Sequence, residues 1–550
     1  MKKVGTLLGA SALLVSAGAV SAQDKVPELT PEEMKKAAQI YFDRCAGCHG
    51  MLRGGATGPP LKPETMRQRG LDYLKWIITE GTPGGMPDWG KQGILSEKEI
   101  ELLAKYLMHE PAPPPEMSLE DMLKTWKVYV PPEERPKKPE HNRNWKNFMG
   151  VILRDVGKVA IIDGDTKELV NIVDTGFAVH IFRASGSGRY FLTIGRDGKA
   201  TLIDLWMKKP DKVAEVKVCY DARSIDTSKY KGKKGNYMDK LAIVGCYWPP
   251  SIVIMDGQTL KPFKIVSTSG YTYDTEEFVR EARVASMVAS HYDPAWVVSV
   301  KETGHVWIVD YSKLPDVTVH MIEAERFLHD GGWDLSKRYF LVAANMRNKM
   351  VAIDVKKKKL VAKIETGVKP HPGRGANVKH PKYGPIYCTG HIGSNNVACI
   401  GTDPERHPKY AWKVVANIEL PGPGGGTLFI KTHPKSKHIW VDRPLNPDDK
   451  LKRQVYVIDK KTLKVIKTID VIEDLKKAGY EMPKGVRVVH PEYDMYGKEV
   501  WISVWGRKDQ PTAIVVYDDK TLKLKKVITG DWVRTPTGIF NLYTTQKDIY

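Results

Sequence analysis

Cysteine is scarce in this chain, which holds only six among 550 residues. Exported proteins that rely on a disulfide scaffold are far denser in cysteine, so this composition excludes such a scaffold. Two of the six lie together near the N-terminus and the other four are widely spaced. For the spaced four we expect buried free thiols, with a Cys388–Cys399 bridge as the alternative; they are Cys219, Cys246, Cys388 and Cys399.

Long apolar runs are also lacking, except at the N-terminus. Residues 1–22 combine two early lysines, an apolar stretch too short to serve as an anchor, and a Val-Ser-Ala end. This pattern predicts a secretory signal peptide, with the mature chain beginning at Gln23. No later apolar run reaches the length that crosses a bilayer. We therefore expect an exported, soluble protein with no membrane span.

Acidic residues are outnumbered. The chain has 65 Asp and Glu against 85 Lys and Arg, a formal net charge of +20 at pH 7. In an exported protein this excess is not evidence of nucleic-acid binding, and we expect no nucleic-acid partner. The positive field favours the approach of a small anion and of acidic partner proteins. Alternatively, most of the lysines simply form a solvated surface.

The paired cysteines belong to the stretch YFDRCAGCHG, residues 41–50. A redox dithiol does not need the adjacent histidine, and a zinc ribbon needs a second ligand pair nearby, whereas the next cysteine is Cys219. The motif therefore predicts a covalently attached c-type haem. Cys45 and Cys48 would form the thioethers, and His49 would be an axial ligand.

Two helix signals flank this motif. Thr30 with Glu33, and Ser96 with Glu99, form capping boxes ahead of apolar positions at helical spacing. Between the helices lies EGTPGGMPDWG, where Met86 sits on a loop and serves no apolar face. We assign it as the sixth haem ligand, since thioether sulfur raises the potential of a haem iron. The alternative is a methionine packing on the ring edge.

The chain divides into a cytochrome c domain at residues 23–110, a Pro-rich stiff linker at 111–144 and a repeat region at 145–550. The repeat is an apolar strand ending in Asp, a polar turn and another strand, at a mean spacing of about 51 residues. Four short strands per repeat predict an all-β propeller of eight blades behind a small all-α domain. The repeated aspartates are Asp163, Asp204, Asp256, Asp310, Asp354, Asp403, Asp459 and Asp518.

Three of the fifteen histidines stand in loop phrases rich in Gly and Arg. These are His180 in DTGFAVHIFRASGSGR, His329 in ERFLHDGGWD and His371 in KPHPGRGANVKHP. Taken singly, each is better explained as a structural histidine. Together, around a propeller funnel, they are typical of a metal ligand and a pair of proton donors.

At this point the sequence resembles the cytochrome cd1 nitrite reductases over nearly the whole mature chain. The phrases that carry the resemblance are IYFDRCAGCHGMLRGGATG, IGRDGKATLIDLWMK, GCYWPPSIVIMDGQTL, RFLHDGGWD, HPGRGAN and LFIKTHP. The resemblance implies one covalent haem c, one non-covalent haem d1, and one-electron reduction of nitrite to nitric oxide in denitrification. It also implies a periplasmic homodimer that receives electrons from a small cytochrome c or cupredoxin.

Site residues follow from the same resemblance. It makes His180 the ligand of the d1 iron, and His329 and His371 the distal catalytic pair. Haem d1 carries several carboxylates, which require fixed cations in a partly buried pocket. The positions that match the family's d1 contacts are Arg154, Arg183, Arg196, Arg223, Ser224, Tyr247, Arg374, Gln510 and Thr537.

One feature of some family members is missing. Residues 23–29 hold no tyrosine that would cover the d1 iron. Two other classes remain open: a protein of d1 assembly, which would be expected to lack part of the distal pair, and a quinohaemoprotein dehydrogenase. HPGRGAN and the arginine set argue against the second.

Overall fold

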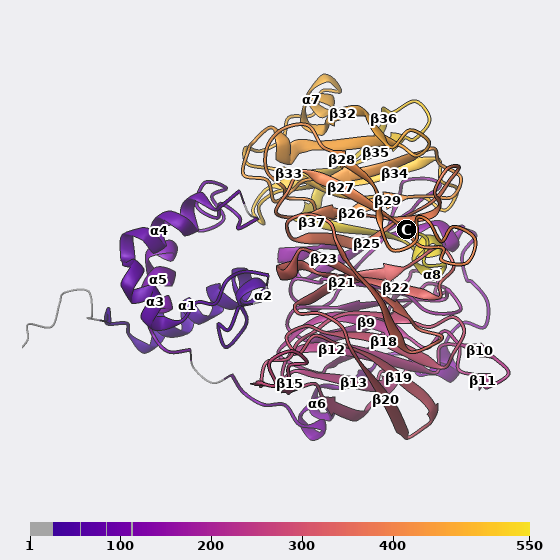
Figure 1. The fold of residues 1–550 in the computed structure, drawn as a ribbon, viewed down its shortest axis with the longest axis horizontal. Helices are drawn as coiled ribbons and strands as arrows, with labels where there is room; N and C mark the ends of the chain where they lie inside the picture. Colours follow the sequence, from indigo (N-terminus) through magenta and orange to yellow (C-terminus); the bar gives the residue numbers. More distant parts are fainter. Residues whose placement is uncertain (1–25, 56, 84, 112–113) are drawn as a thin grey trace, which may run out of the picture.

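The structure is a computed structural model that describes residues 26–55, 57–83, 85–111 and 114–550. The predicted signal peptide, residues 1–22, lies outside the described residues. A small helical domain sits beside one face of a large ring of strands (Figure 1). The predicted fold class, a cytochrome c domain followed by an eight-bladed propeller, is confirmed.

The N-terminal domain is built from short helices. Both predicted capping boxes are present, at Thr30 and at Ser96, each with its side chain accepting from the backbone N–H three residues on. Apolar faces of the first and last long helices meet in a core that includes Leu103 and Cys45. The helices are α1 (Pro31–Arg44), α2 (Ala46–His49), α3 (Pro63–Arg69), α4 (Leu71–Glu80) and α5 (Glu97–Leu107).

In the described part of the chain, the remaining strands form eight four-stranded antiparallel blades. Blade 1 is β37 (Pro536–Asn541), β2 (Phe148–Leu153), β3 (Lys158–Asp163) and β4 (Leu169–Asp174). Blade 2 is β5 (Ile181–Ala184), β6 (Tyr190–Ile194), β7 (Lys199–Asp204) and β8 (Asp211–Lys217). Blade 3 is β9 (Asp221–Thr227), β12 (Leu241–Trp248), β13 (Ser251–Asp256) and β14 (Pro262–Ser267). Blade 4 is β17 (Val284–Ala289), β18 (Ala295–Val300), β19 (His305–Lys313) and β20 (Asp316–Glu323).

The second half repeats this order. Blade 5 is β21 (Leu328–Trp333), β22 (Tyr339–Ala344), β23 (Lys349–Asp354) and β24 (Lys359–Glu365). Blade 6 is β25 (Pro370–His380), β26 (Gly384–His391), β27 (Asn396–Gly401) and β28 (Val414–Glu419). Blade 7 is β29 (Ile430–Thr432), β30 (His438–Asp442), β31 (Gln454–Asp459) and β32 (Lys464–Asp470). Blade 8 is β33 (Arg487–Tyr493), β34 (Glu499–Trp505), β35 (Pro511–Asp518) and β36 (Lys523–Arg534).

Short elements decorate the blades. Two small hairpins pair β10 (Lys231–Gly232) with β11 (Gly235–Asn236), and β15 (Gly270–Tyr271) with β16 (Phe278–Val279). Helix α7 (Val471–Lys477) follows blade 7, and α8 (Leu542–Gln546) follows β37.

The first strand of each blade faces the centre, because these strands contact one another in a closed cycle around the ring. The last of them in chain order, β37, pairs antiparallel with β2, with Val151 opposite Ile539. Blade 1 is therefore completed from both ends of the repeat region, which leaves no open sheet edge between the first blade and the last.

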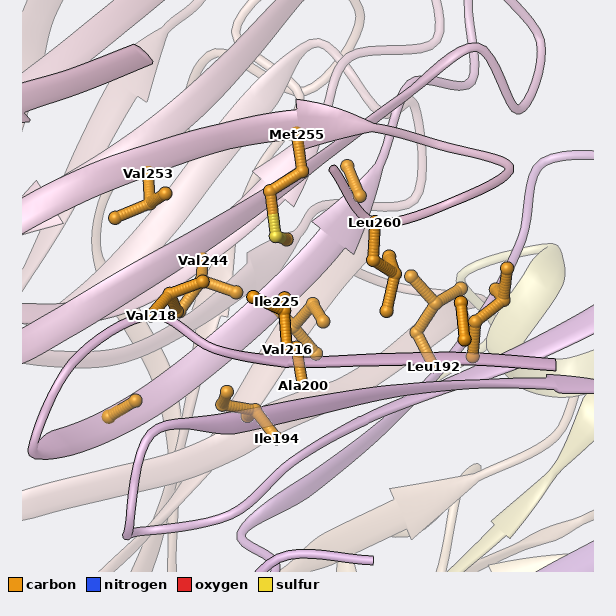
Figure 2. Close-up of a cluster of buried hydrophobic side chains, with 14 of the residues drawn as sticks. Leu192, Ile194, Ala200, Val216, Val218, Ile225, Val244, Val253, Met255 and Leu260 are labelled. Atoms are coloured by element: carbon orange, nitrogen blue, oxygen red, sulfur yellow. The ribbon is translucent and has the colours of Figure 1, made fainter. Parts of the chain in front are cut away.

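Neighbouring blades stack through apolar side chains. Between blades 2 and 3 the packed residues include Leu192, Ala200 and Val216 on one side and Val244 and Met255 on the other (Figure 2). The middle strands are buried on both faces, so they read as continuous apolar runs. Burial of this kind stabilises by about 25 cal/mol per Å² of apolar surface.

The repeated aspartate ends the third strand in six of the eight blades, where it closes the turn to the fourth; Asp310 lies inside β19, and Asp403 lies two residues after β27. Asp163 accepts hydrogen bonds from the backbone N–H groups of Asp165 and Thr166, and Asp459 accepts from Lys461 and Thr462 in the same way. The carboxylate thus satisfies the turn's free donors. This local device explains why Asp marks every repeat.

The Pro-rich segment carries more structure than a stiff extended linker. It contains helix α6 (Leu119–Thr125), which begins at a capping box of Ser118 and Asp121. It also contains strand β1 (Lys127–Val128), which pairs with β8 as a fifth strand of blade 2. Met122 of α6 is buried against that blade. The flanking prolines concealed this helix in the sequence.

The expectation of four free thiols is wrong. The structure pairs Cys219 with Cys246, at a Cα separation of 6.2 Å, and Cys388 with Cys399, at 4.0 Å. Cys388 and Cys399 are directly opposite each other on β26 and β27, so the register itself brings them together. The other pair is 27 residues apart and meets only through the fold of blade 3.

No helix in the described part of the chain has the length and apolar character needed to cross a bilayer.

Candidate functional site

The candidate site residues of the propeller gather at one end of the ring. Some lie at the start of innermost strands, and others lie in turns between the second and third strands of a blade. Both kinds of segment open on the end of the ring that the N-terminal domain covers (Figure 1). On innermost strands are Arg183, Arg223, Ser224, His329, His371, Arg374 and Thr537; Arg154, Arg196 and Gln510 lie in turns, Tyr247 on β12, and His180 just before β5.

Two predicted distal histidines share one carboxylate. His329 Nδ1 lies 2.9 Å from Asp330 Oδ1, and His371 Nε2 lies 2.9 Å from Asp330 Oδ2. The two imidazole rings are 5.1 Å apart between centroids, although they come from blades 5 and 6. We call these three residues the distal triad.

The hydrogen bonds assign different protonation states to the two rings. His371 Nδ1 also faces the carbonyl of Leu428 at 2.9 Å, so both of its nitrogens face acceptors, which suits an imidazolium. His329 has an acceptor on one nitrogen only. The distal triad therefore stores one proton on His371 and leaves His329 neutral.

Electrostatics around the triad agree with this assignment. Burial opposes the charge of His371, but Asp330 outweighs it and raises the pKa of that histidine. Burial lowers the pKa of His329 to about 3, and the nearby Lys301 ammonium adds to the shift. For Asp330 the two histidines outweigh burial and hold the carboxyl pKa well below its usual range.

His180 stands just before β5, at the same end of the ring as the distal triad. The His180 side chain is exposed to the open space at the end of the ring. The surrounding protein still limits its contact with bulk water, and this burial lowers the pKa of His180 well below the usual range. Arg223 contributes further to the shift. Among the described residues, no side-chain hydrogen bond occupies either ring nitrogen. A neutral imidazole with a free lone pair can ligate a metal.

The predicted d1-binding arginines are buried, and several of their side-chain nitrogens lack a hydrogen-bond acceptor. Arg183 and Arg196 are 3% exposed, and side-chain nitrogens of both lack a hydrogen-bond acceptor, as does Nε of Arg223. Burial, with the neighbouring arginines, lowers the pKa of Arg154 to about 10. Unpaired buried donors are costly. Their gathering therefore fits a cofactor that brings several carboxylates, and Ser224 Oγ is a further buried group without a partner.

Four members of the predicted set show no unpaired buried polar atom that a cofactor would satisfy. Gln510 is exposed in the turn before β35, and Thr537 is half-buried on β37. Arg374 donates to the carbonyls of Met287 and Gly331, so its guanidinium joins blades 4, 5 and 6. Tyr247 packs against Arg223, whose guanidinium carbon lies 5.1 Å from the ring centroid. For these four, as for the other arginines and Ser224, cofactor contact stays a prediction.

The CxxCH segment has the features that a covalent haem needs. Cys45 and Cys48 are free, and Cys45 is buried, which raises its pKa to about 12. His49 Nδ1 lies 2.8 Å from the carbonyl of Pro59, so this nitrogen carries the proton and Nε2 keeps its lone pair. Met86 packs against the same core as Cys45. The residues therefore fit haem c.

The sequence prediction missed Asp330 of the distal triad and three residues at the junction of the two domains. Asp330 directly follows His329 in RFLHDGGWD, and an acidic residue beside a candidate proton donor was a signal that could have identified it. Glu281, Arg283 and Lys301 contact the N-terminal domain from positions more than two hundred residues away along the chain. Nothing in the sequence pairs them with that domain.

Comparison with known proteins agrees with this arrangement. Residues 143–545 match the Cytochrome D1 heme domain family, and residues 32–107 match the family of the cytochrome C oxidase, cbb3-type, subunit III. The nitrite reductase of Stutzerimonas stutzeri is 48% identical over the full length of both chains. The dihydro-heme d1 dehydrogenase of Pseudomonas aeruginosa is 25% identical over 92% of each chain.

A solved structure of dihydro-heme d1 dehydrogenase NirN in complex with DHE shares the fold, with a TM-score of 0.67 and 24% identity over 93% of this chain and all of that one. Fold and site together define a cytochrome c domain joined to a cofactor-binding propeller. The chain belongs to the cytochrome cd1 nitrite reductases, which carry haem c and haem d1.

Proposed function

We propose that this chain reduces nitrite by one electron to nitric oxide, consuming two protons and releasing water. The observation that carries the proposal is the distal triad, a stored proton at the same end of the ring as His180 and the unpaired arginines. When bound, haem d1 supplies the iron at which nitrite is reduced, with electrons delivered through haem c.

Each protein group has one task in this proposal. His180 offers its free ring nitrogen to the d1 iron, and the arginine cluster binds the carboxylates of haem d1. His371 donates a proton to the departing oxygen of nitrite, and His329 relays a proton from solvent that returns His371 to its charged form. His371 then donates this second proton, so that the oxygen leaves as water. Asp330 is a positioning residue that orients both imidazoles.

The absorption spectrum of protein from its own host, together with nitric oxide production from nitrite, tests the proposal. A d1 band beside the c bands with nitrite-dependent nitric oxide is expected. A c-only spectrum after faithful export would sink the assignment. Oxidation of a d1 precursor without nitrite turnover would instead favour the activity named for the Pseudomonas aeruginosa relative.

The setting of the enzyme is part of the proposal. The two disulfides support residence in the oxidising periplasm. The net positive charge supports an acidic cytochrome c or cupredoxin as the electron donor. We further propose a homodimer, and domain limits at residues 23–110 and 145–550.

Replacement of Asp330 by Asn should move the alkaline limb of the pH–activity profile to lower pH. The Asp330 carboxylate is what raises the pKa of His371, so its loss lets burial lower that pKa, and His371 gives up its proton at a lower pH. His329 on blade 5 and buried Asp442 on blade 7 are the other titratable groups that face His371. Nitrite turnover measured across pH checks the shift.

The exposed Asp316 on β20 offers a control for this experiment. Asp316→Asn should leave the profile unchanged. An Asp330→Asn enzyme with the parent profile and full d1 content would remove Asp330 from the proposed proton store.

Replacement of Met86 by Ala should lower the potential of haem c and open its iron to carbon monoxide, because the thioether ligand is lost. Met34→Ala is a matched control, since Met34 packs against the same core without a proposed ligand role. Redox titration and carbon monoxide difference spectra measure the outcome. An unchanged potential without carbon monoxide binding would show that another residue holds the sixth position.

A further inference from the structure

Residues next to the blade 4 strands form hydrogen bonds with the CxxCH motif and with the loop that follows it. Glu281 Oε1 accepts a hydrogen bond from the backbone N–H of Met51 at 2.6 Å, and Glu281 Oε2 accepts from Leu52 at 2.8 Å. Glu281 is 8% exposed. One propeller carboxylate therefore satisfies two consecutive amides just after the haem motif.

Arg283 holds the same loop through its carbonyls. Its Nη1 donates to Ala46 at 3.3 Å and its Nη2 donates to Gly55 at 3.0 Å. Glu302 fixes the guanidinium from the other side, since Nε donates to Glu302 Oε1 at 2.7 Å. The side chain is 1% exposed, so these charge-assisted bonds lie away from bulk water.

A third contact extends the grip. Lys301 Nζ donates to Thr57 Oγ1 at 3.1 Å, and both side chains are buried. Arg283 and Lys301 lie next to Val284 and Val300, which are opposite each other at the ends of β17 and β18, and the N–H of Lys301 donates to the carbonyl of Arg283 at 2.8 Å. The sheet register thus holds the cations side by side.

The same residues border the d1 pocket. Arg283 and Arg223 each place a guanidinium carbon near the ring of Tyr247, 5.2 and 5.1 Å from its centroid. A Cβ added at Gly47 would collide with the guanidinium of Arg223. The haem c motif therefore lies directly against Arg223, a predicted d1 contact.

We propose that Glu281, Arg283 and Lys301 form a clamp of positioning residues that fixes the haem c loop against the propeller and so sets the separation of the two haems. The clamp rests on the proposed attachment of haem c at Cys45 and Cys48. This role is additional to cofactor binding and proton donation. It adds blade 4 to blades 1, 2 and 5, whose turns also contact the N-terminal domain.

Hydrogen–deuterium exchange of holoenzyme tests the clamp without relying on turnover. Glu281→Ala should speed exchange of a peptide spanning residues 50–55 by about tenfold or more, because two buried amides lose their acceptor. Reduction of haem d1 by pre-reduced haem c, followed by stopped-flow absorption, should slow by about tenfold as the loop loses its fixed position. Glu281→Gln keeps the shape and one acceptor oxygen, and should give a smaller change in both measurements.

Glu276→Gln is the matched control, an exposed acid in the connection that leads to Glu281, and it should behave as the parent. Haem-stained denaturing gels show separately whether haem c is attached, so failure of the attachment proposal is distinguishable. If Glu281→Ala does not fold, the Gln variant decides. Parent exchange in residues 50–55 with a parent transfer rate would overturn the clamp.

Discussion

Replacing His371 by Ala should lower nitrite turnover by about 10² or more while both haems stay bound, the usual scale for loss of a general acid. The His371 imidazole, whose nitrogens face Asp330 and the Leu428 carbonyl, holds the proton that we propose is transferred to nitrite. His329→Ala should have an effect of the same order, because it removes the residue proposed to relay the second proton to His371. Steady-state nitrite reduction with d1 quantified in the same samples measures both.

Two further variants separate proton donation from cofactor loss. His320→Ala, on the outer strand β20, should turn over nitrite at the parent rate. His180→Ala should instead loosen or lose haem d1, since it removes the proposed iron ligand. Parent turnover by a fully loaded His371→Ala or His329→Ala enzyme would exclude that histidine as a proton donor.

The double replacement of Cys45 and Cys48 by Ala should abolish covalent haem altogether. Both thiols are free in the structure and no other free cysteine lies in the described residues, so no alternative thioether can form. Electron entry from a donor protein should then fail, although chemically reduced d1 can still react once. Haem staining of a denaturing gel gives the answer directly.

The matched control removes a different pair of cysteines. Cys388→Ala with Cys399→Ala deletes a disulfide between neighbouring strands and should leave covalent haem intact. Haem retained on the protein after loss of Cys45 and Cys48 would refute the attachment site.

Features set by local sequence were predictable here. Each blade carries an aspartate near the turn after its third strand, and the two longest helices of the N-terminal domain, α1 and α5, begin at capping boxes. Helix α6 has the same signal at Ser118, but the surrounding prolines outweighed it in the sequence reading. The Cys219–Cys246 bridge depends on how blade 3 folds, which no spacing rule supplies.

The candidate site likewise contains residues that local sequence identifies and contacts that only the folded chain reveals. His180, His329 and His371 stand in distinctive phrases, so the sequence pointed to them. That one carboxylate joins two histidines from different blades depends on the closure of the ring. The contacts of Glu281 with Met51 and Leu52 join positions about 230 residues apart, and only the docked domains reveal them.

From the pairing of β37 with β2 we expect the two haems to be inserted in a fixed order. The N-terminal domain has its own hydrophobic core and contains both predicted thioether cysteines, so we expect it to fold and accept haem c before the ring closes. The d1 pocket has no such independence. The predicted d1 contacts include Arg154, next to β2, and Thr537, on β37, and these come together only when β37 pairs with β2. We therefore expect haem d1 to be inserted after haem c, because a chain that lacks β37 cannot close the ring.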